Sequence, residues 1–312
     1  MKYSWVSITK SCVNFGNFQI EFCLKKILEE HGFTQKPDFF VDGFVVNSKK
    51  IAEEVNKTDF LLVPGCTTLT VKHYPGLQSI IENIKVPIFN LGAAFFGQPD
   101  QDSIPYFKYF YQPIGVRDPE SENFLKQNNI PVKLIGCPTL FSGTAEKFEN
   151  RQTNKIVFIF GLKEIENQKE ILKMLIQKKY DIQLLIQEKS QKKLIKEFNL
   201  NPIIYSPENL MNALKDARLM VTGRLHGALP AIACGTPVFF TQTVDDSRFS
   251  LLNYLGIESF SFKDEPLEEK LFRQIKNLEF TNSKYTFEKV KILRSAFNNY
   301  VDEVLKEISL LS

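Results

Sequence analysis

Residues that bind anions and transfer protons stand close together in the run VTGRLHGALPAIACGTPVFF, which covers residues 221–240. Arg224 is a fixed cation, and His226 titrates near neutral pH. The run predicts a strand, a tight turn at Gly223, a helix that begins between His226 and Leu229, and a second strand. Because the exposed N–H groups of a helix N-terminus favour an anion, this turn points to chemistry on a phosphate or a carboxylate.

The elements that must position this turn alternate along the chain. Strands are expected at residues 5–8, 39–46, 60–64, 86–91, 114–116, 133–135, 155–160, 182–187, 203–205, 217–221 and 238–241. Helices are expected at residues 18–31, 76–84, 164–177, 191–198, 208–214 and 246–255, and another opens at residues 118–121. Such alternation is typical of parallel β-α units, whose ligands bind at the carboxyl ends of the strands.

The predicted fold class is therefore α/β, with two Rossmann-like doubly wound domains that face each other across a cleft. We expect an N-terminal domain over residues 1–145 and a C-terminal domain over residues 146–285, joined through the polar stretch 141–154. Residues 286–312 belong to a long amphipathic helix, which we expect to pack across the domains and to return to the first.

Composition indicates a soluble globular enzyme. The net charge is only +3, and the basic residues are balanced by acids, so no nucleic-acid partner is expected. No stretch approaches the roughly 18 apolar residues that a membrane span needs, and no signal peptide is visible at the N-terminus, so we expect a cytoplasmic protein. The five cysteines are widely spaced without a C-x-x-C pair, which predicts buried reduced thiols and no metal site.

Five short segments of the sequence occur in the same order as the motifs of one protein family. They read NFGN at 14–17, DFLLVPG at 59–65, GVRDPES at 115–121, GCP at 136–138, and GRLHG at 223–227 followed by GTP at 235–237. Through these segments the chain resembles the polysaccharide pyruvyl transferase family over most of its length, to about residue 260. The last segment is the most diagnostic, because it matches the pattern R-x-H-G followed by G-x-P.

The resemblance implies a GT-B-like arrangement and a reaction. An enolpyruvyl-derived group would pass from phosphoenolpyruvate to a sugar of a cell-surface polysaccharide or of its lipid-linked precursor, which makes a pyruvate ketal. His226 would be the general acid/base, while Arg117 and Arg224 would bind the donor anion across the cleft. The remaining residues expected at the site are Gly223, Gly227 and Arg248 for the donor and Asn14, Gly16, Asn17, Gly65 and Thr67 for the acceptor.

The same resemblance places the donor on the C-terminal domain and the acceptor on the N-terminal domain. Phosphoenolpyruvate would be a co-substrate, with no cofactor and no metal. A lipid-linked acceptor would bring the protein to the inner membrane face. Three departures from the family pattern concern the acceptor side: Asn17 replaces an aspartate, Cys137 replaces the aspartate of an Asp-Pro pair, and residues 64–66 read PGC where a Gly-Gly pair is usual.

Two other functions stay open on the sequence alone, as does the oligomeric state. A GT-B glycosyltransferase would bind the diphosphate of a nucleotide sugar at the same helix N-terminus, with Asp245 or Asp246 for the ribose. A catalytically inactive scaffold in envelope-polysaccharide biosynthesis would account for the three departures. Single residues also have structural alternatives: Arg224 as a domain-packing ion pair, Arg117 as a salt bridge with Asp118, and His31 and His73 as structural side chains.

Overall fold

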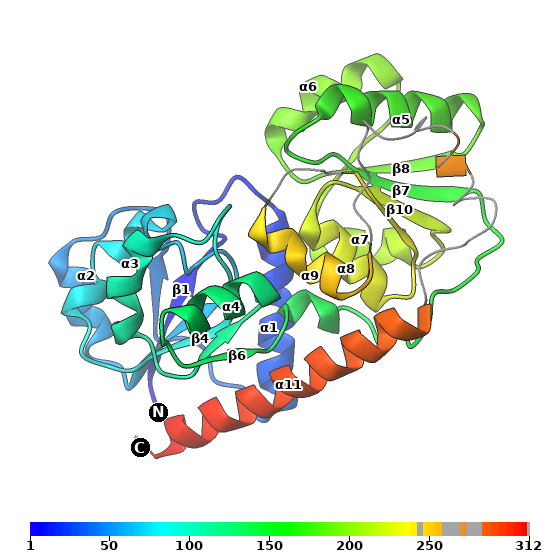
Figure 1. Ribbon diagram of the computed structural model, residues 1–312. Coiled ribbons are helices and arrows are strands. Elements are labelled where there is room, and N and C mark those ends of the chain that lie inside the picture. The colour runs from blue at the N-terminus through cyan, green and yellow to red at the C-terminus, as the bar shows by residue number, and fades with distance from the viewer. Residues whose placement is uncertain (242–245, 258–268, 270, 273–282, 311–312) are drawn as a thin grey trace.

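The computed structural model describes residues 1–241, 246–257, 269, 271–272 and 283–310. Two sheets, one from each half of the chain, lie next to each other with helices packed against them (Figure 1). The paired strands of both sheets are parallel. The predicted α/β class, with a parallel sheet in each half, is confirmed.

The first sheet has the strand order β2-β1-β3-β4-β5-β6 in the described residues. Its strands are β1 (Tyr3–Ser7), β2 (Phe39–Asp42), β3 (Phe60–Pro64), β4 (Ile88–Ala93), β5 (Ile114–Val116) and β6 (Val132–Leu134). The helices of this half are α1 (Gly16–Glu30), α2 (Lys49–Val55), α3 (Pro75–Gln78) and α4 (Pro119–Gln127), with 3₁₀ turns η1 (Val71–His73), η2 (Ile81–Asn83), η3 (Gln101–Tyr109) and η4 (Pro138–Phe141). The central strands are unbroken apolar runs because helices cover both faces of a parallel sheet.

The second sheet has the order β11-β10-β7-β8-β9 in the described residues. Its strands are β7 (Lys155–Ile159), β8 (Asp181–Ile186), β9 (Ile203–Ile204), β10 (Leu219–Thr222) and β11 (Val238–Phe240). The helices of this half are α5 (Ile165–Gln177), α6 (Lys192–Ile195), α7 (Pro207–Leu214), α8 (Leu225–Ala233) and α9 (Ser250–Tyr254), with 3₁₀ turns η5 (Lys189–Gln191), η6 (Lys196–Phe198) and η7 (Ser247–Phe249).

The strand order creates a switch point in each sheet. In the first sheet the chain leaves β1 toward β2 on one side and then returns to β3 on the other. In the second sheet β7 is flanked by β8 on one side and β10 on the other. At such points the loops after neighbouring strands diverge and leave a crevice. The residues that follow β1, β3, β7 and β10 are therefore placed to form a site.

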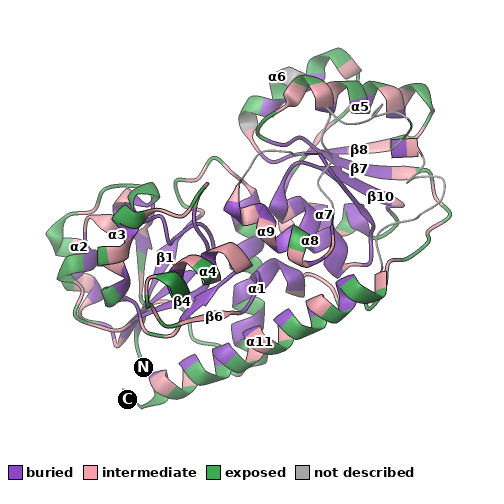
Figure 2. Cartoon of the chain, in the orientation of Figure 1, coloured by how far each residue is buried: buried purple, intermediate pink, exposed green. Residues whose placement is uncertain are grey.

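The C-terminal helix α11 (Ser283–Ser309) runs beneath both halves, and the two chain ends lie near each other (Figure 1). Its N-terminal part packs into the core of the second half through Phe287, Val290 and Leu293. Its C-terminal part packs against Trp5 and the other core residues of the first half. Figure 2 shows its buried residues recurring as a stripe along the side that faces the protein.

Several elements differ from the sequence-based expectation. The strand expected over 39–46 ends at Asp42, because the chain turns at Gly43, where an added Cβ would lie 3.2 Å from the Ser7 carbonyl oxygen. The helix expected over 76–84 is divided into α3 and η2, and that over 191–198 into α6 and η6. Helix α2 was not predicted, since it buries only Ala52 and Val55 and so gives a weak periodic signal.

No helix within the described ranges is both long enough and apolar enough to cross a bilayer. The five cysteines are free thiols. The expectation of burial is confirmed for three of them and is wrong for Cys12 and Cys234, which are partly exposed.

Candidate functional site

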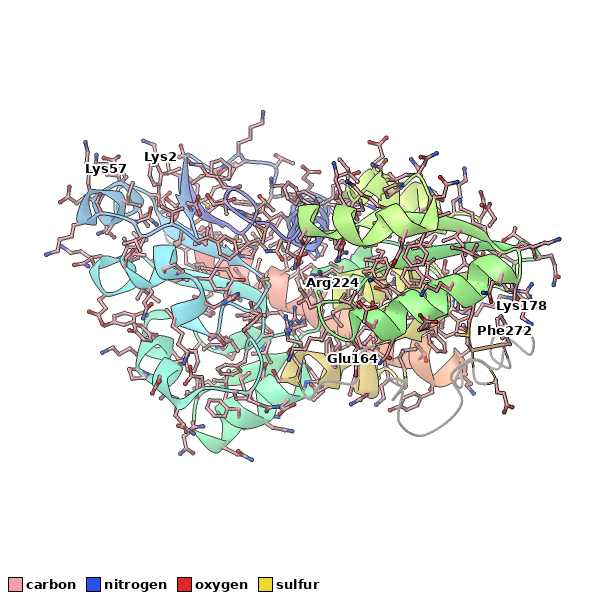
Figure 3. All side chains as sticks on the ribbon, turned by 90° about the horizontal axis from the view of Figure 1, so that it is seen from above. Lys2, Lys57, Glu164, Lys178, Arg224 and Phe272 are labelled. Atoms are coloured by element: carbon pink, nitrogen blue, oxygen red, sulfur yellow. The ribbon has the colours of Figure 1, made fainter. Side chains whose placement is uncertain are left out.

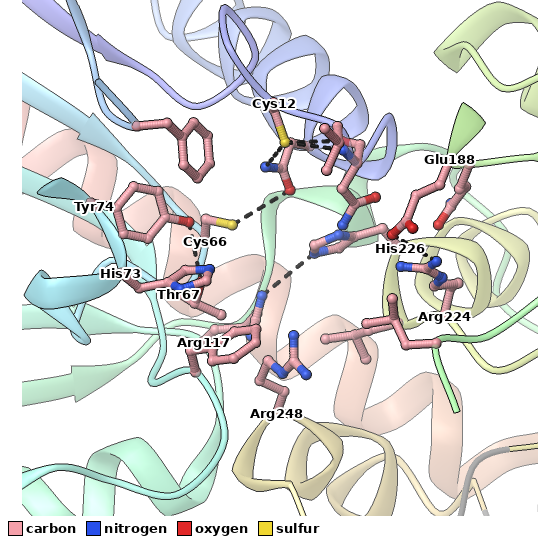
Figure 4. Close-up of a pocket in the computed structure, with 18 of the residues that line it drawn as sticks. Cys12, Cys66, Thr67, His73, Tyr74, Arg117, Glu188, Arg224, His226 and Arg248 are labelled. Atoms are coloured by element: carbon pink, nitrogen blue, oxygen red, sulfur yellow. Dashed lines mark hydrogen bonds and ion pairs between the residues drawn. The ribbon is translucent and has the colours of Figure 1, made fainter. Parts of the chain in front are cut away.

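A cavity of about 370 Å³ lies where the carboxyl ends of the two sheets meet (Figure 4). Both switch points contribute to its wall: Cys12 and Asn14 follow β1, Thr67 follows β3, Leu162 follows β7, and Arg224 follows β10. Figure 3 shows Arg224 at the junction of the two halves, far from Lys57 at one end and Lys178 at the other. The cleft that the sequence predicted between two α/β halves is therefore present.

The loop after β1 is held in place by Asn17. Its side-chain nitrogen donates to the Ile8 carbonyl at 3.0 Å and to Cys12 Sγ at 3.1 Å, and its oxygen accepts from Cys66 Sγ at 3.6 Å. Asn14 Oδ1 accepts from the Gly16 N–H at 2.9 Å and turns the chain into α1. Burial raises the pKa of Cys12 to about 11, so this thiol is uncharged at neutral pH.

Replacing Asn17 by aspartate, the residue usual in the family pattern, is expected to destabilise this protein at neutral pH. The carboxylate would face the Ile8 carbonyl oxygen, now 3.0 Å from an amide donor. A buried unsatisfied group costs about 1–3 kcal/mol, and more when it is charged. Urea unfolding should show the loss at pH 7 and its partial recovery near pH 4, where a protonated carboxyl can donate. Equal stability of Asn17→Asp and the parent at pH 7 contradicts this role for Asn17.

Arg117 follows β5 and is about 1% exposed. Its neighbour Asp118 caps α4 by accepting from the Ser121 N–H at 2.9 Å, and Ser121 Oγ in turn accepts from the Phe95 N–H at 3.4 Å. The Arg117 Nε–Asp118 Oδ2 distance is 3.9 Å, and burial raises the pKa of that carboxyl. The local salt bridge with Asp118 is thus long, and neither Nε nor Nη2 of Arg117 has a hydrogen-bond partner in the described structure.

Cys137 lies in electrostatic range of Arg117, which lowers the pKa of its thiol, while burial raises that pKa by more. The thiol is therefore neutral. Where the family pattern has an aspartate, this chain therefore places no negative charge beside Arg117.

Arg224 has a different environment. Its Nε donates to the Phe160 carbonyl at 3.1 Å, and its Nη2 binds Glu188 Oε1 at 2.9 Å. Glu188 comes from the end of β8, so this is an ion pair within the second half. Arg224 still lines the cavity, and the pair fixes its orientation there.

His226 stands in the first turn of α8. The expected start of this helix between His226 and Leu229 is wrong, because α8 begins at Leu225 and places Pro230 inside the helix. A proline there has no N–H for the carbonyl four residues earlier, which belongs to His226. Tyr205 Oη donates to that carbonyl at 3.0 Å and so satisfies it.

Removing this hydroxyl should therefore destabilise the protein. Tyr205→Phe is expected to lower the free energy of unfolding by about 1–3 kcal/mol, because it leaves a buried carbonyl without a donor. The control is Pro230→Ala, which restores the helical N–H to the same carbonyl. Denaturant unfolding of both single variants and the double variant should show a smaller cost of Tyr205→Phe in the alanine background. Additive costs contradict this coupling.

His226 Nε2 lies 3.5 Å from Arg117 Nη1, at the outer limit of a hydrogen bond (Figure 4). Because an arginine can only donate hydrogen bonds, Nε2 is the acceptor in this contact. The His226 side chain also lines the cavity. Burial is the main cause that holds the pKa of His226 well below its ordinary value, and the positive charges of Arg117, Arg248 and Arg224 lower it further. His226 is therefore neutral at pH 7.

Arg248 reaches the same cavity from η7. Its guanidinium makes a two-point ion pair with Asp246, and its Cζ lies 4.7 Å from the centre of the Phe96 ring. The neighbouring Ser247 N–H donates to the Gly97 carbonyl at 3.2 Å, which ties this segment to the first half. Asp246 is thus occupied with Arg248, and Asp245, the other residue expected for a ribose, lies outside the described residues.

Most of the residues expected at the site meet in this cavity. The ones that line it are Asn14, Asn17, Thr67, Arg117, Gly223, Arg224, His226 and Arg248.

The three glycines expected at the site, Gly16, Gly65 and Gly227, are not among the lining residues. Each instead allows other atoms to approach the backbone closely. A Cβ on Gly16 would lie 3.3 Å from His226 Cβ, a Cβ on Gly227 3.0 Å from Thr222 Oγ1, and one on Gly65 would overlap the Leu91 carbonyl. The binding role expected for these three glycines stays a prediction.

Sequence reasoning missed part of the lining. His73, expected to be structural, faces the cavity together with Phe96, and Glu188 was not singled out. His31, also expected to be structural, binds Asp302 of α11 at 2.6 Å. Among the described side chains, no group of three or more histidine, cysteine, aspartate or glutamate residues is placed to hold a metal ion.

Comparison with known proteins bears on family and fold. The model of one family, polysaccharide pyruvyl transferase, matches residues 14–242. No curated protein matches the chain. Similar solved structures include Staphylococcus aureus MnaA with UDP, at 14% identity and a TM-score of 0.68 over 99% of this chain and 98% of that one. Another is the UDP-GlcNAc 2-epimerase of Neisseria meningitidis bound to UDP-GlcNAc, at 14% identity and a TM-score of 0.62 over 98% and 100%. These alignments along whole chains confirm the two-domain GT-B-like fold.

Proposed function

Because the chain belongs to the polysaccharide pyruvyl transferase family, we propose that it transfers a pyruvyl group from phosphoenolpyruvate to a sugar. The product is a pyruvate ketal on a cell-surface polysaccharide or on its lipid-linked precursor, the latter at the inner membrane face. The observation that supports this proposal most is the buried Arg117 guanidinium, which has unpartnered donors and lies beside the acceptor nitrogen of His226.

The donor carries a phosphate and a carboxylate, and the cavity supplies three arginines. An isolated buried charge is costly, so a protein keeps one where a ligand of opposite charge binds. Arg117 fits this role, because it lines the cavity, its contact with Asp118 is long, and its buried Nε and Nη2 have no hydrogen-bond partner in the described structure. Arg248 and Arg224, already oriented by Asp246 and Glu188, add positive charge for the second group. Arg117 and Arg224 would then act from different domains on one donor.

The reaction needs one proton transfer to carbon. As the first sugar hydroxyl adds to C2 of the donor, its proton passes to His226 and then to C3, and the methylene becomes a methyl group. The second hydroxyl then attacks C2, the bond from C2 to the phosphate oxygen breaks, and phosphate leaves with the electron pair. The proton of the second hydroxyl leaves with the phosphate. His226, neutral in the free protein, is suited to begin as the base.

Binding of the donor should change the protonation of His226. In the free protein Arg117, Arg248 and Arg224 lower the pKa of His226 in addition to burial. An anion that neutralises these arginines removes this repulsion and raises the pKa toward the working pH. The donor would thereby prepare the imidazole to hold the proton that C3 receives.

This coupling predicts a pH titration that can be followed by NMR, because the chain has three histidines. We expect His226 of the free protein to stay neutral at pH 6.5 and its midpoint to rise when phosphoenolpyruvate is added. The unfolded chain binds this proton near pH 6.5, so the free protein should lose stability as the pH falls below that value, and His226→Gln should lessen the loss. A midpoint at or above 6.5 in the free protein contradicts the expectation.

The function is tested first by ligand binding. Phosphoenolpyruvate at about 100 times its dissociation constant should stabilise the fold by roughly 2.7 kcal/mol, which a thermal shift detects. The control ligands are UDP and UDP-GlcNAc, chosen because both comparison structures hold one of them. Phosphate release in the presence of a saccharide panel then tests transfer. A shift with a uridine nucleotide and none with phosphoenolpyruvate would overturn the proposal in favour of a nucleotide-sugar donor.

A further inference from the structure

A second cavity of about 360 Å³ adjoins the first, and the two share His73 and Phe96 in their walls. The rest of its lining comes from Thr70 and Lys72 at η1, from the loop between β4 and η3, which includes Gln98 and Asp100, and from Gln101 at the start of η3. The second cavity therefore belongs to the first half of the chain, the side expected to bind the acceptor. The two cavities therefore meet at His73 and Phe96.

The shared wall is an aromatic stack. The rings of His73 and Phe96 are nearly parallel, at 13°, with their centres 4.1 Å apart. Arg248 Cζ lies 4.7 Å from the centre of the Phe96 ring. Phe96 is nevertheless 42% exposed, which is high for a large apolar side chain in contact with a cavity. The stack thus lies between the arginine side of the first cavity and the second cavity, and part of Phe96 remains exposed.

The charges of the two cavities differ. The described lining of the first includes Arg117, Arg224 and Arg248. In the second, Lys72 forms an ion pair with Asp100, so its charge is matched by a protein group. The other polar side chains there include the amides of Gln98 and Gln101, which can both donate and accept hydrogen bonds. The second cavity therefore suits a neutral ligand rich in hydroxyl groups better than an anion.

We propose that the second cavity binds a sugar residue of the acceptor next to the one that receives the pyruvyl group. The inference rests on the proposed function and adds the size of the acceptor, which is an oligosaccharide of two or more residues. The exposed part of Phe96 can pack against the C–H groups of a sugar, while the amides of Gln98 and Gln101 bind its hydroxyls. Apolar contact with a few placed polar groups is typical of small-molecule sites.

The test uses a double variant away from the arginines and His226. Gln98 and Gln101 are both exposed, so Gln98→Ala/Gln101→Ala should leave the fold intact. The matched control is Gln127→Ala/Gln177→Ala, which removes two exposed glutamines elsewhere. The protein with saturating phosphoenolpyruvate is probed against an array of mono- to tetrasaccharides, and calorimetry measures donor affinity separately.

We expect oligosaccharides to bind at least tenfold more tightly than their terminal monosaccharides, and the double variant to lose at least fivefold of that affinity. Donor affinity should be unchanged in the double variant, and the control should behave like the parent. Monosaccharides bound as well as their oligosaccharides, unchanged binding by the double variant, or no bound glycan with donor binding intact would each overturn the subsite. Failure of phosphoenolpyruvate itself to bind would instead count against the proposed function.

Discussion

Arg117→Met is expected to weaken donor binding strongly and to lower the stability of the free protein only slightly. Hydrogen bonds to charged groups contribute about 1.5–3 kcal/mol each, so losing two unpartnered donors should raise the dissociation constant of phosphoenolpyruvate by at least about 100-fold. The free protein should lose only a few degrees of melting temperature, because the ion pair that Arg117 makes with buried Asp118 is long, at 3.9 Å, and burial already raises the pKa of the carboxyl that would be left alone. Calorimetry and thermal unfolding measure the two effects.

The unequal sizes of these two effects separate a binding role of Arg117 from a structural one. An arginine that only holds the fold together would lower the melting temperature when removed and leave donor affinity unchanged. Arg117→Lys is the control for geometry, since it keeps the charge and loses the fork of two donors; its affinity should fall between those of the parent and Arg117→Met. Arg218→Met, a change in the second half away from the cavity lining, should leave donor affinity at the parental value.

His226→Gln should lower the rate of transfer by about 10²–10⁴-fold, the usual contribution of a general acid/base, while donor affinity stays within a few-fold. In the proposed mechanism the imidazole would carry a proton from a hydroxyl to C3, and an amide cannot do so. The helix is expected to remain folded, because the carbonyl of residue 226, which Tyr205 binds, is unchanged by the substitution. Single-turnover phosphate release with an acceptor from the saccharide panel measures the rate.

The pH profile supplies an independent readout. The rate of transfer by the parent should fall at acidic pH, where His226 takes up a proton and can no longer act as the base. The residual rate of His226→Gln should not show this acidic decrease. A variant with parental transfer rates would remove His226 from the mechanism. A variant that neither binds the donor nor keeps its melting temperature would point to a structural role instead.

Much of the fold could be predicted because its central strands are uninterrupted apolar runs. The predicted bounds of β3 and β5 agree with the structure, and Asp118 followed by Pro119 marked the start of α4. The start of α8 was placed wrongly because Pro230 was assumed to lie in its first turn. What makes that proline tolerable is a hydroxyl from Tyr205, and such a partner 21 residues away has no signature in a local pattern.

The site was predictable where it rests on strand ends and not where it rests on side-chain pairing. Parallel sheets bring strand ends to one edge, so Arg117, Arg224 and His226 could be expected together. The sequence did not indicate that Arg224 would be paired with Glu188 while Arg117 would lack a close partner. It also did not indicate that His73 would stack on Phe96, because that contact depends on how two loops of the first half meet.

The path of α11 has a consequence for how the protein is made. The core around Trp5 is closed by Phe297, Tyr300, Val301, Val304 and Ile308. During synthesis the first half therefore emerges from the ribosome with an open apolar face, which is covered only after residues 297–308 have been made. Folding in order from the N-terminus cannot be completed, and the exposed face is where a chaperone would be needed most. Premature termination just before residue 297 should leave the first half defective, although that half has already been synthesised.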